Sequence, residues 1–412
     1  MKFAPFACVV TTVLSIASAI PATAQPASIC PAQFGSVANR IVSRLPARWS
    51  VLVQTQGASG VRQNLYDRNA TLQLIPASNN KLFTSAAALT KLGAQFRFRT
   101  PVFGNSADPD LATLRVIGQG DPSLSTAQLS ALSQQLRSRG VRQVKLLIGD
   151  DTVFQGASFN PFWSADDRGQ GYAAPINSLM LNSNNIYEGA VPNPGNYFVR
   201  EFRNNLAKTG IKVVQSTLVK RTSAPAGEVE LASVASPALS SLLYTMNQES
   251  DNAYAEALLK TLGHLQNPGA DSTSSGVAAV KSTLSDLGVN PSRYTMVDGS
   301  GLADRNRASA EAFVQTLQGM AASPNAVVFR RSLPVAGVSG TLSSRFRGTT
   351  AQGIVSAKTG TISGAVSLSG YVTSPNYSPL VFSVIVNSND YASRIRPVID
   401  DLVVQMTRLR NC

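Results

Sequence analysis

Three short motifs in a fixed order contain the residue types needed for acyl transfer through a serine nucleophile. They are Ser78-Asn79-Asn80-Lys81, Ser250-Asp251-Asn252 and Lys358-Thr359-Gly360. A serine hydroxyl is a poor nucleophile at neutral pH and needs a nearby base. Histidine is the usual base, but the chain has only His264, after Gly263 at the end of a predicted helix. We expect a capping or surface role for it, and a Ser-His-Asp triad is the disfavoured alternative.

Lys81 is the expected base. The Ala- and Leu-rich segment behind Pro76 predicts a helix from Asn79 to Leu92, ended by Gly93. Its i, i+3 spacing puts Ser78 and Lys81 on one side of that helix. Burial, the positive helix end and a second cation all lower a lysine pKa, and a lysine without its proton can act as a base. Because S-x-x-K occurs by chance in long chains, the argument depends on all three motifs together.

The second and third motifs supply groups that bind substrate and move protons. Ser250 could relay a proton between Lys81 and a leaving amine, and Asn252 could hold a substrate peptide group. N-capping is the alternative for this motif, since Ser, Asp and Asn all favour that position, and both roles can coexist. On a strand, Lys358 and Thr359 suit a substrate carboxylate. Gly360 would let a peptide approach the backbone closely.

Metal and cofactor chemistry receive no support from the sequence. With one histidine the chain cannot carry an H-E-x-x-H zinc site, and two cysteines near its ends make no zinc cluster. The stretch Gly118-Gln119-Gly120-Asp121-Pro122 lacks the third glycine of a dinucleotide-binding loop, because position 123 is serine. A tight turn is the better interpretation.

The elements that must position the motifs lie toward the two ends of the chain. Strands are expected from Trp49 to Thr55 and toward Tyr66, and again over Gly353–Ala357, Val366–Val372 and Leu380–Val386. Helices are expected at Ala238–Met246, Ala253–Leu262 and over a final amphipathic segment. Between Phe96 and about Ser236 the character changes: short strands flank a helix from Thr126 to Arg139, and another helix follows from Asn196 to Lys208. These patterns predict an inserted α/β domain at 96–236 within a discontinuous domain of residues 25–95 and 237–412.

The N-terminus has the features of a secretory signal peptide. A lysine at position 2 precedes an apolar run from Ala7 to Ile20, and Ala22-Thr23-Ala24 provides small residues for cleavage near Ala24. We therefore expect residues 1–24 to be removed from an extracytoplasmic protein. Cys30 and Cys412 would then be the remaining pair, and in an exported protein such a pair predicts a disulfide, with two unrelated free thiols as the alternative.

The formal net charge of +13 favours acidic partners such as cell-wall polymers or anionic lipid headgroups, or reflects solubility alone. Nucleic acid is not an expected partner, because the chain is expected to be exported and has no dense run of Lys and Arg.

Beyond the three motifs, several further stretches resemble the penicillin-binding D-alanyl-D-alanine carboxypeptidases and endopeptidases of the S13 peptidase family. They are Pro76-Ala77-Ser78-Asn79, Gly118-Gln119-Gly120-Asp121-Pro122, Asp298-Gly299-Ser300-Gly301-Leu302 and Gly337-Val338-Ser339-Gly340-Thr341-Leu342. The resemblance covers nearly the whole expected mature chain. It includes a long insertion between the first two motifs, here roughly 170 residues and shorter than in larger members.

The resemblance implies an α+β penicillin-binding fold, in which helices cover both faces of an antiparallel sheet built from the two chain ends. It implies Ser78 as the acylated nucleophile, Lys81 as base, and Ser250 and Asn252 as second-motif partners. Lys358, Thr359 and Gly360 would lie on the cleft strand. The backbone N–H groups of Ser78 and Thr361 would form the oxyanion hole.

The expected activity is hydrolysis of the terminal D-Ala-D-Ala bond of peptidoglycan stem peptides, with β-lactams as covalent inhibitors. Cleavage of D-Ala to diamino-acid crosslinks is a further expectation that sequence cannot rank. A β-lactamase needs a deacylating glutamate, and between the second and third motifs only Glu256 and Glu311 occur, neither in an E-x-x-L-N setting. A wall-binding scaffold with a residual site remains the alternative of a different class.

Overall fold

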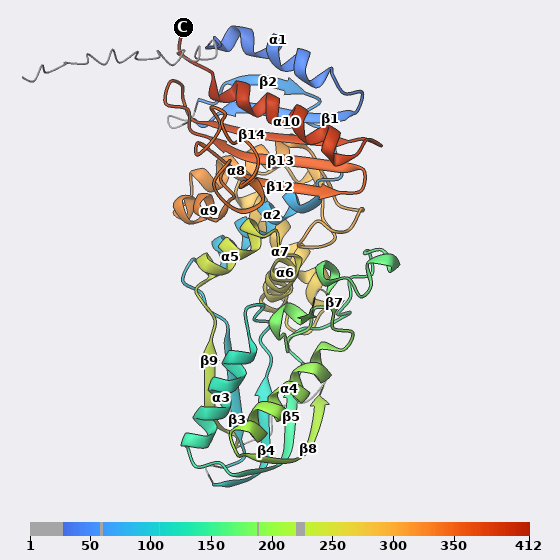
Figure 1. The fold of residues 1–412 in the computed structure, drawn as a ribbon, viewed down its shortest axis with the longest axis vertical. Helices are drawn as coiled ribbons and strands as arrows, with labels where there is room; N and C mark the ends of the chain where they lie inside the picture. The colour runs from blue at the N-terminus through green and yellow to red at the C-terminus, as the bar shows by residue number, and fades with distance from the viewer. Residues whose placement is uncertain (1–27, 58–60, 107, 188, 220–226) are drawn as a thin grey trace, which may run out of the picture.

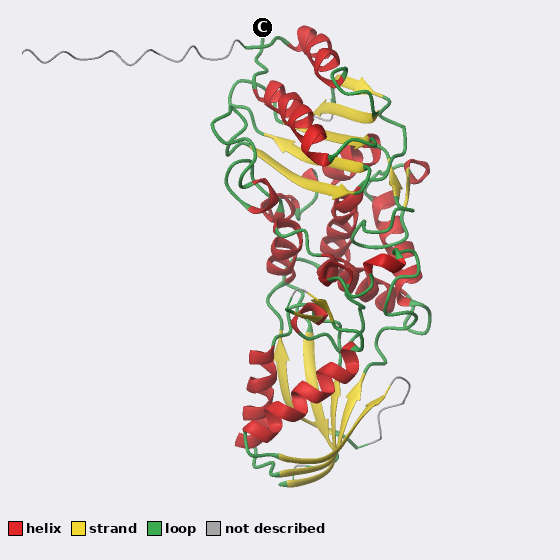
Figure 2. Ribbon diagram, turned by 45° about the vertical axis from the view of Figure 1, so that its right-hand side comes forward, coloured by secondary structure: helices red, strands yellow, loops and turns green. Residues whose placement is uncertain are grey.

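A computed structural model of the chain describes residues 28–57, 61–106, 108–187, 189–219 and 227–412. The expected signal peptide lies outside these residues. The molecule is elongated, with a sheet at each end and a layer of helices between them (Figures 1 and 2). No helix within the described ranges is long and apolar enough to cross a membrane.

The first sheet is built from both ends of the chain, as expected. Its order is β12-β13-β14-β1-β2, and every neighbouring pair is antiparallel. The strands are β1 (Arg48–Thr55), β2 (Asn64–Arg68), β12 (Val355–Ile362), β13 (Ala365–Val372) and β14 (Leu380–Asn387). Every residue of β13 is buried, because helices cover the sheet on both faces.

One face of this sheet carries the two terminal helices. The helices α1 (Pro31–Val42) and α10 (Ala392–Thr407) pack against each other and on the sheet, as Figure 1 shows. Cys30, the N-cap of α1, forms a disulfide with Cys412 just beyond α10. The predicted pairing of the two cysteines is therefore confirmed.

The other face packs on the central helical layer. Its helices are α2 (Lys81–Leu92), α5 (Leu239–Gln248), α6 (Asn252–Gln266), α7 (Ser272–Asp286), α8 (Ala310–Ala321) and α9 (Ala326–Ser332). The helix α8 lies directly on β1 and β14, and α2 contacts α6, α7 and α8. Phe83 of α2 stacks on Phe313 of α8, with ring centroids 4.5 Å apart. The helix that begins after Ser78 is thus held at the centre of a hydrophobic core.

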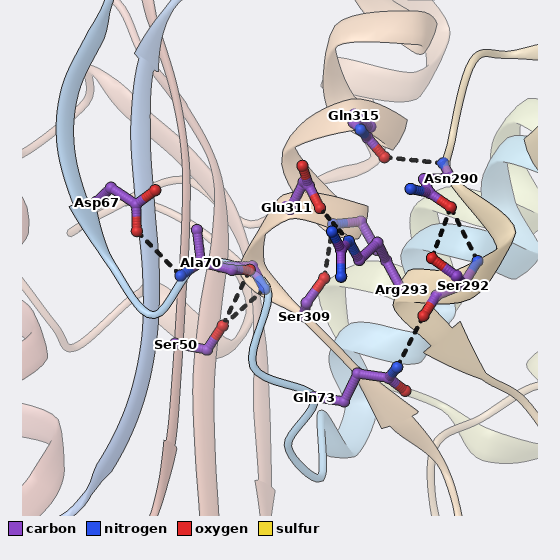
Figure 3. A network of polar contacts seen from close by, with 12 residues as sticks. Ser50, Asp67, Ala70, Gln73, Asn290, Ser292, Arg293, Ser309, Glu311 and Gln315 are labelled. Atoms are coloured by element: carbon purple, nitrogen blue, oxygen red, sulfur yellow. Dashed lines mark hydrogen bonds and ion pairs between the residues drawn. The ribbon is translucent and has the colours of Figure 1, made fainter.

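A polar network joins the sheet to this helical layer (Figure 3). The Ser50 hydroxyl of β1 donates to the carbonyl of Ala70 and accepts from the backbone N–H of Ala310 at the start of α8. Beside it, Arg293 forms an ion pair of 2.6 Å with Glu311 of α8. The Ser50 contact fixes α8 relative to the strand that it covers, and the ion pair fixes α8 relative to the segment that ends at Arg293.

The second sheet lies at the other end of the molecule and has its own hydrophobic core. Its order is β8-β5-β4-β3-β9, with β4, β5 and β8 parallel and β3 antiparallel to both of its neighbours. Its elements are β3 (Arg99–Gly104), β4 (Asp110–Ile117), α3 (Thr126–Ser138), β5 (Gln143–Asp150), α4 (Pro194–Lys208), β8 (Lys212–Val219) and β9 (Val229–Ala235). Parallel strands need crossover connections, and α3 and α4 provide them.

Short elements complete the fold. They are the two-stranded pairs β6 (Asn185–Ile186) with β7 (Gly189–Ala190) and β10 (Tyr294–Thr295) with β11 (Arg307–Ala308), and the 3-10 helices η1 (Ala77–Asn80), η2 (Ala165–Asp167), η3 (Gly171–Ala173), η4 (Asn182–Asn184), η5 (Pro291–Arg293) and η6 (Gly340–Leu342).

Several predicted boundaries differ from the structure. The helix expected from Asn79 is divided into the 3-10 turn η1 and α2, because Ala77 enters the turn with a positive φ of 49°. The strand expected over Gly353–Ala357 is instead β12, which begins at Val355 and continues to Ile362 because it pairs with β13 through a two-residue turn. The helix expected from Asn196 begins two residues earlier, with Pro194 in its first turn.

Candidate active site

The first motif forms a tight turn that presents Ser78 beside Lys81. The Lys81 side chain is completely buried, and its Nζ lies 2.8 Å from Ser78 Oγ. Lys81 Nζ also donates to Asn252 Oδ1 at 2.6 Å and to the Ser300 carbonyl at 2.8 Å. The turn fits closely against Gly301, whose φ is +84° and where an added Cβ would lie 1.9 Å from the Ala77 carbonyl.

The surroundings of Lys81 favour the form that can act as a base. Burial lowers its pKa to about 8, although the charges of Asp298, Asp251 and Glu256 act in the opposite direction. A neutral lysine has two N–H donors and one lone pair. Because the Ser300 carbonyl can only accept, and Asn252 turns its Oδ1 toward the amine, these two groups take both donors. The lone pair is then directed at Ser78.

The three side chains of the second motif have different hydrogen-bond partners. Asp251 is the N-cap of α6 and accepts from the Tyr254 backbone N–H at 3.0 Å, so the predicted capping belongs to this residue. Asn252 donates its Nδ2 to the Tyr172 carbonyl at 2.8 Å, which fixes the direction of its amide. Ser250 has a φ of +61° and accepts from Lys358 Nζ at 2.8 Å.

These contacts refine two of the expected roles. Ser250 bonds to Lys358 rather than to Lys81 in this structure, and the Asn252 amide is engaged at both ends by Lys81 and Tyr172. A proton relay through Ser250 and a substrate contact through Asn252 stay predictions. Either role requires one of these hydrogen bonds to be exchanged when substrate binds.

The third motif lies on β12, the edge strand of the first sheet. Lys358 is completely buried, and its Nζ donates to Ser250 and, at 2.9 Å, to the Thr359 carbonyl. Burial, assisted by the charge of Lys81, lowers the pKa of Lys358 well below its usual value. The Thr359 hydroxyl lies 2.7 Å from that of Thr341. Two basic groups and several hydroxyls therefore meet at one edge of the sheet.

Gly360 lets the serine turn lie directly against β12. An added Cβ at this position would be 2.7 Å from the Pro76 carbonyl and 3.0 Å from the Asn79 nitrogen. The hydroxyl of Ser367 on β13 donates to the Pro76 carbonyl at 2.6 Å, which ties the same turn to the sheet.

The backbone of Thr361 faces the open edge of β12. Ala357 of this strand donates its N–H away from β13, to the Pro334 carbonyl at 2.9 Å. Strand residues two apart point their N–H groups the same way, so the Thr361 N–H also points away from β13. Ser78 lies in the first turn of its helix, where backbone N–H groups lack intrahelical acceptors. The Thr361 N–H is therefore outside the β12–β13 hydrogen-bond ladder, and the Ser78 N–H is outside the hydrogen bonds of its helix.

Several residues of the site were not assigned a role from the sequence. Asp298 is buried and accepts from the backbone N–H groups of Gly301 and Ala303, both at 2.7 Å, and from Trp163 Nε1 at 3.0 Å. It thereby fixes the loop that carries Ser300. In the sequence, the stretch from Asp298 to Leu302 carries only a family resemblance, and its Asp-Gly-Ser-Gly pattern is the one signal for this loop. Nothing in the sequence marked the contact from Tyr172.

The disfavoured candidates lie elsewhere. His264 is in the last turn of α6 and takes no part in the hydrogen bonds described around Ser78, and burial lowers its pKa. Within the described ranges, no group of three or more His, Cys, Asp or Glu side chains could hold a metal ion.

The antiparallel sheet, the helices on both of its faces and the three motifs at its edge define the penicillin-binding fold. The crystal structure of penicillin-binding protein 4 from Haemophilus influenzae is similar, with a TM-score of 0.79 over 90% of this chain and 98% of that one, at 22% identity. The same comparison finds a predatory peptidoglycan endopeptidase from Bdellovibrio bacteriovorus, with a TM-score of 0.61, 20% identity and coverage of 88% and 93%.

Sequence comparison then gives the family. The model of the D-Ala-D-Ala carboxypeptidase 3 (S13) family matches residues 43–196 and 187–407, so the chain belongs to this family. A D-alanyl-D-alanine carboxypeptidase from Actinomadura sp. (strain R39) is 32% identical over 409 residues, covering 79% of this chain and 76% of its own. The carboxypeptidase DacB of Mycolicibacterium smegmatis is 31% identical, with coverage of 84% and 78%. The expected family is therefore confirmed.

Proposed function

We propose that this serine D,D-carboxypeptidase removes the terminal D-Ala from peptidoglycan stem peptides through an acyl-enzyme on Ser78. The observation that carries the proposal is the 2.8 Å contact between Ser78 Oγ and a completely buried Lys81. Ser78 Oγ attacks the carbonyl of the penultimate D-Ala while Lys81 takes the hydroxyl proton. The C–N bond to the terminal D-Ala breaks, its nitrogen gains a proton, and water later hydrolyses the ester.

The remaining roles follow from the order of groups along β12. Lys358 and Thr359 bind the terminal carboxylate of the substrate, and the N–H groups of Ser78 and Thr361 stabilise the oxyanion. The upstream part of the stem peptide must then continue toward Ser363 at the end of the strand. A hollow of about 700 Å³ opens there, with both polar and apolar walls. Its lining includes Ile75, Trp163, Asp167, Arg305, Ile362 and Ser363.

β-Lactams should acylate the same serine and remain bound. Of the two candidate glutamates for deacylation, Glu256 is completely enclosed and accepts from two backbone N–H groups, and Glu311 is paired with Arg293. Neither arrangement activates a water molecule beside Ser78. Slow hydrolysis of the penicilloyl ester, and hence inhibition, is the expected result.

We further propose that the protein acts outside the cytoplasm, after cleavage near Ala24, and that residues 96–236 form an inserted domain. The Cys30–Cys412 disulfide supports an oxidising compartment, and the separate core of the second sheet supports the division. The net charge of +13 would favour the anionic wall, with weak attraction to membrane headgroups.

D,D-endopeptidase activity would use the same catalytic groups. The bond cleaved would then be the one between D-Ala and the amine of a crosslink.

The first experiment asks whether Ser78 is acylated and turned over. The purified protein should bind a fluorescent penicillin covalently and release D-Ala from a D-Ala-D-Ala peptide, and Ser78→Ala should lose both. Labelling that persists in Ser78→Ala would refute the assignment. Labelling without D-Ala release would favour the wall-binding scaffold instead. Digestion of crosslinked and uncrosslinked muropeptides, with products identified by mass, separates endopeptidase from carboxypeptidase activity.

A further inference from the structure

A buried glutamate lies behind the site, on the far side of the loop that contacts Lys81. Glu256 is on α6, one turn after Asn252, and its side chain is 2% exposed. Its Oε1 accepts from the backbone N–H groups of Gly299 at 3.0 Å and Ser300 at 2.8 Å. An added Cβ on Gly299 would lie 2.6 Å from the Ala255 carbonyl, so only glycine permits this close approach of the loop to α6.

The loop passes this contact on to the catalytic lysine. The carbonyl of Ser300, whose N–H is held by Glu256, accepts from Lys81 Nζ at 2.8 Å. This carbonyl is one of the two acceptors that direct the lone pair of neutral Lys81 at Ser78. The carboxylate of Glu256 therefore holds the N–H side of Ser300, the residue whose carbonyl orients the base, and Asp298 holds the following N–H, that of Gly301.

We propose that Glu256 is a positioning residue for acylation: it anchors Ser300 against α6, and its negative charge favours the protonated form of Lys81. The inference deepens the proposed function and rests on it. Glu256 touches neither substrate nor Ser78, so its effect on the reaction passes through Lys81.

The charged groups around Glu256 come from three elements. Asp298 and the anchored backbone belong to the loop, Lys260 to α6 and Lys81 to α2, while Asp251, the N-cap of α6, acts on Lys81. Burial, followed by the charge of Asp298, raises the pKa of Glu256 to about 7, so both of its charge states occur near neutrality. Burial lowers the pKa values of Lys81 and Lys260, and the negative charge of Glu256 opposes this lowering at both lysines. Lys260 donates to the Ala157 carbonyl at 2.9 Å.

Two substitutions separate charge from position. Glu256→Gln keeps an oxygen for the two N–H groups but removes the charge, whereas Glu256→Asp keeps the charge and withdraws it by one methylene. Glu311→Gln is the matched control, because Glu311 lies in the network of Figure 3, away from Lys81, and loses only its ion pair with Arg293.

The readout is the second-order rate of penicillin acylation between pH 5 and 9, where the rising limb reports the pKa of the base. Removing a negative charge lowers the pKa of Lys81, so Glu256→Gln should move the midpoint of this limb down by about 0.5 to 1 pH unit. Glu256→Asp should leave the midpoint in place and lower the plateau about tenfold, because the anchor of Ser300 is lengthened. Glu311→Gln should superimpose on the parent.

The outcomes distinguish this inference from the function beneath it. A parent protein that is not acylated at Ser78 would refute the proposed function itself. A parent that is acylated, with a Glu256→Gln profile identical to the control, would overturn the role of the charge, and an unchanged Glu256→Asp plateau would overturn the anchor. Should a variant fail to fold, carbon-13 NMR of glutamate carboxyls in the parent replaces it. Acylation of Ser78 must then shift the titration midpoint of one buried glutamate carboxyl. A midpoint that stays unchanged on acylation contradicts the proposal.

Discussion

At the scale of single residues, the site brings together two buried lysines that differ in the charge they need. In the proposed mechanism, Lys81 must be neutral to accept a proton from Ser78, whereas Lys358 must be charged to bind a substrate carboxylate. Burial lowers both pKa values, and Lys358 is lowered further by the charge of Lys81. An arriving carboxylate would stabilise the charged form of Lys358. Substrate binding and activation of the base are therefore compatible, because the anion itself supplies the missing counter-charge.

Replacing Lys81 by methionine should abolish acylation and stabilise the fold. Loss of the base should slow penicillin acylation by about 10³-fold or more. The folded-state pKa of about 8, against 10.5 in the unfolded chain, means that the unfolded chain binds the proton more tightly. The resulting destabilisation is complete below pH 8 and disappears as the pH rises from about 8 to 10.5. Lys81→Met should therefore raise the unfolding free energy at pH 7 by about 1 to 3 kcal/mol, after the loss of its hydrogen bonds.

Urea denaturation of the parent and Lys81→Met at pH 7 and pH 10 checks this effect. The gain should be largest at pH 7 and shrink at pH 10. Lys91→Met, in the last turn of the same helix and exposed to solvent, is the control and should change stability little at either pH. A Lys81→Met protein less stable than the parent at pH 7 would contradict the reasoning.

At the scale of elements, the site depends on the fit between the serine turn and β12. Only glycine fits at position 360. An added methyl group would lie 2.3 Å from the Ser367 hydroxyl and 2.7 Å from the Pro76 carbonyl. The distance between the strand and the turn sets where the N–H groups of Ser78 and Thr361 lie. The positions of the two proposed oxyanion donors therefore depend on this contact.

Gly360→Ala should separate the turn from the strand. We expect penicillin acylation to fall by about 10²-fold or more, since even a small misplacement of oxyanion donors is costly, with a stability loss of about 1 to 3 kcal/mol from overpacking. Stopped-flow labelling and thermal denaturation measure the two effects. Gly35→Ala in α1, where an added Cβ meets nothing within 4 Å, is the control and should be neutral or slightly stabilising. Normal acylation by Gly360→Ala would show that the close contact is unnecessary.

The sequence predicted the parts of the site that depend on local spacing, and it missed those that depend on tertiary packing. Lys81 was found because i, i+3 spacing brings it to Ser78 on one turn. The partner of Ser250 could not be found in this way, because it depends on where β12 lies relative to α6. The same holds for Glu256: an acidic residue within an apolar helix pattern is ambiguous until the loop at Gly299 and Ser300 is seen packed upon it.

At the scale of the whole molecule, the N-terminal and C-terminal segments of the chain come together in one sheet. The first sheet combines β1 and β2 with the three C-terminal strands, and the disulfide joins α1 to the segment after α10 (Figure 1). The serine turn η1 and the strand β12 lie side by side because the two ends of the chain share this sheet. Tyr172, which lies in the stretch between β5 and α4, completes the site by holding Asn252. The catalytic arrangement therefore depends on the closure of the whole chain.

Removing the disulfide tests that dependence. A cross-link between residues 382 positions apart restricts the unfolded chain over almost its full length, so Cys30→Ser with Cys412→Ser should lose about 2 to 5 kcal/mol of unfolding free energy. Because the bridge lies at the ends of α1 and α10, and not at the cleft strand, penicillin acylation at 25 °C should be unchanged while the melting temperature falls. Reduction of the parent should reproduce the loss. Equal melting of the oxidised and reduced proteins would mean that packing of α1 on α10 already holds the ends together.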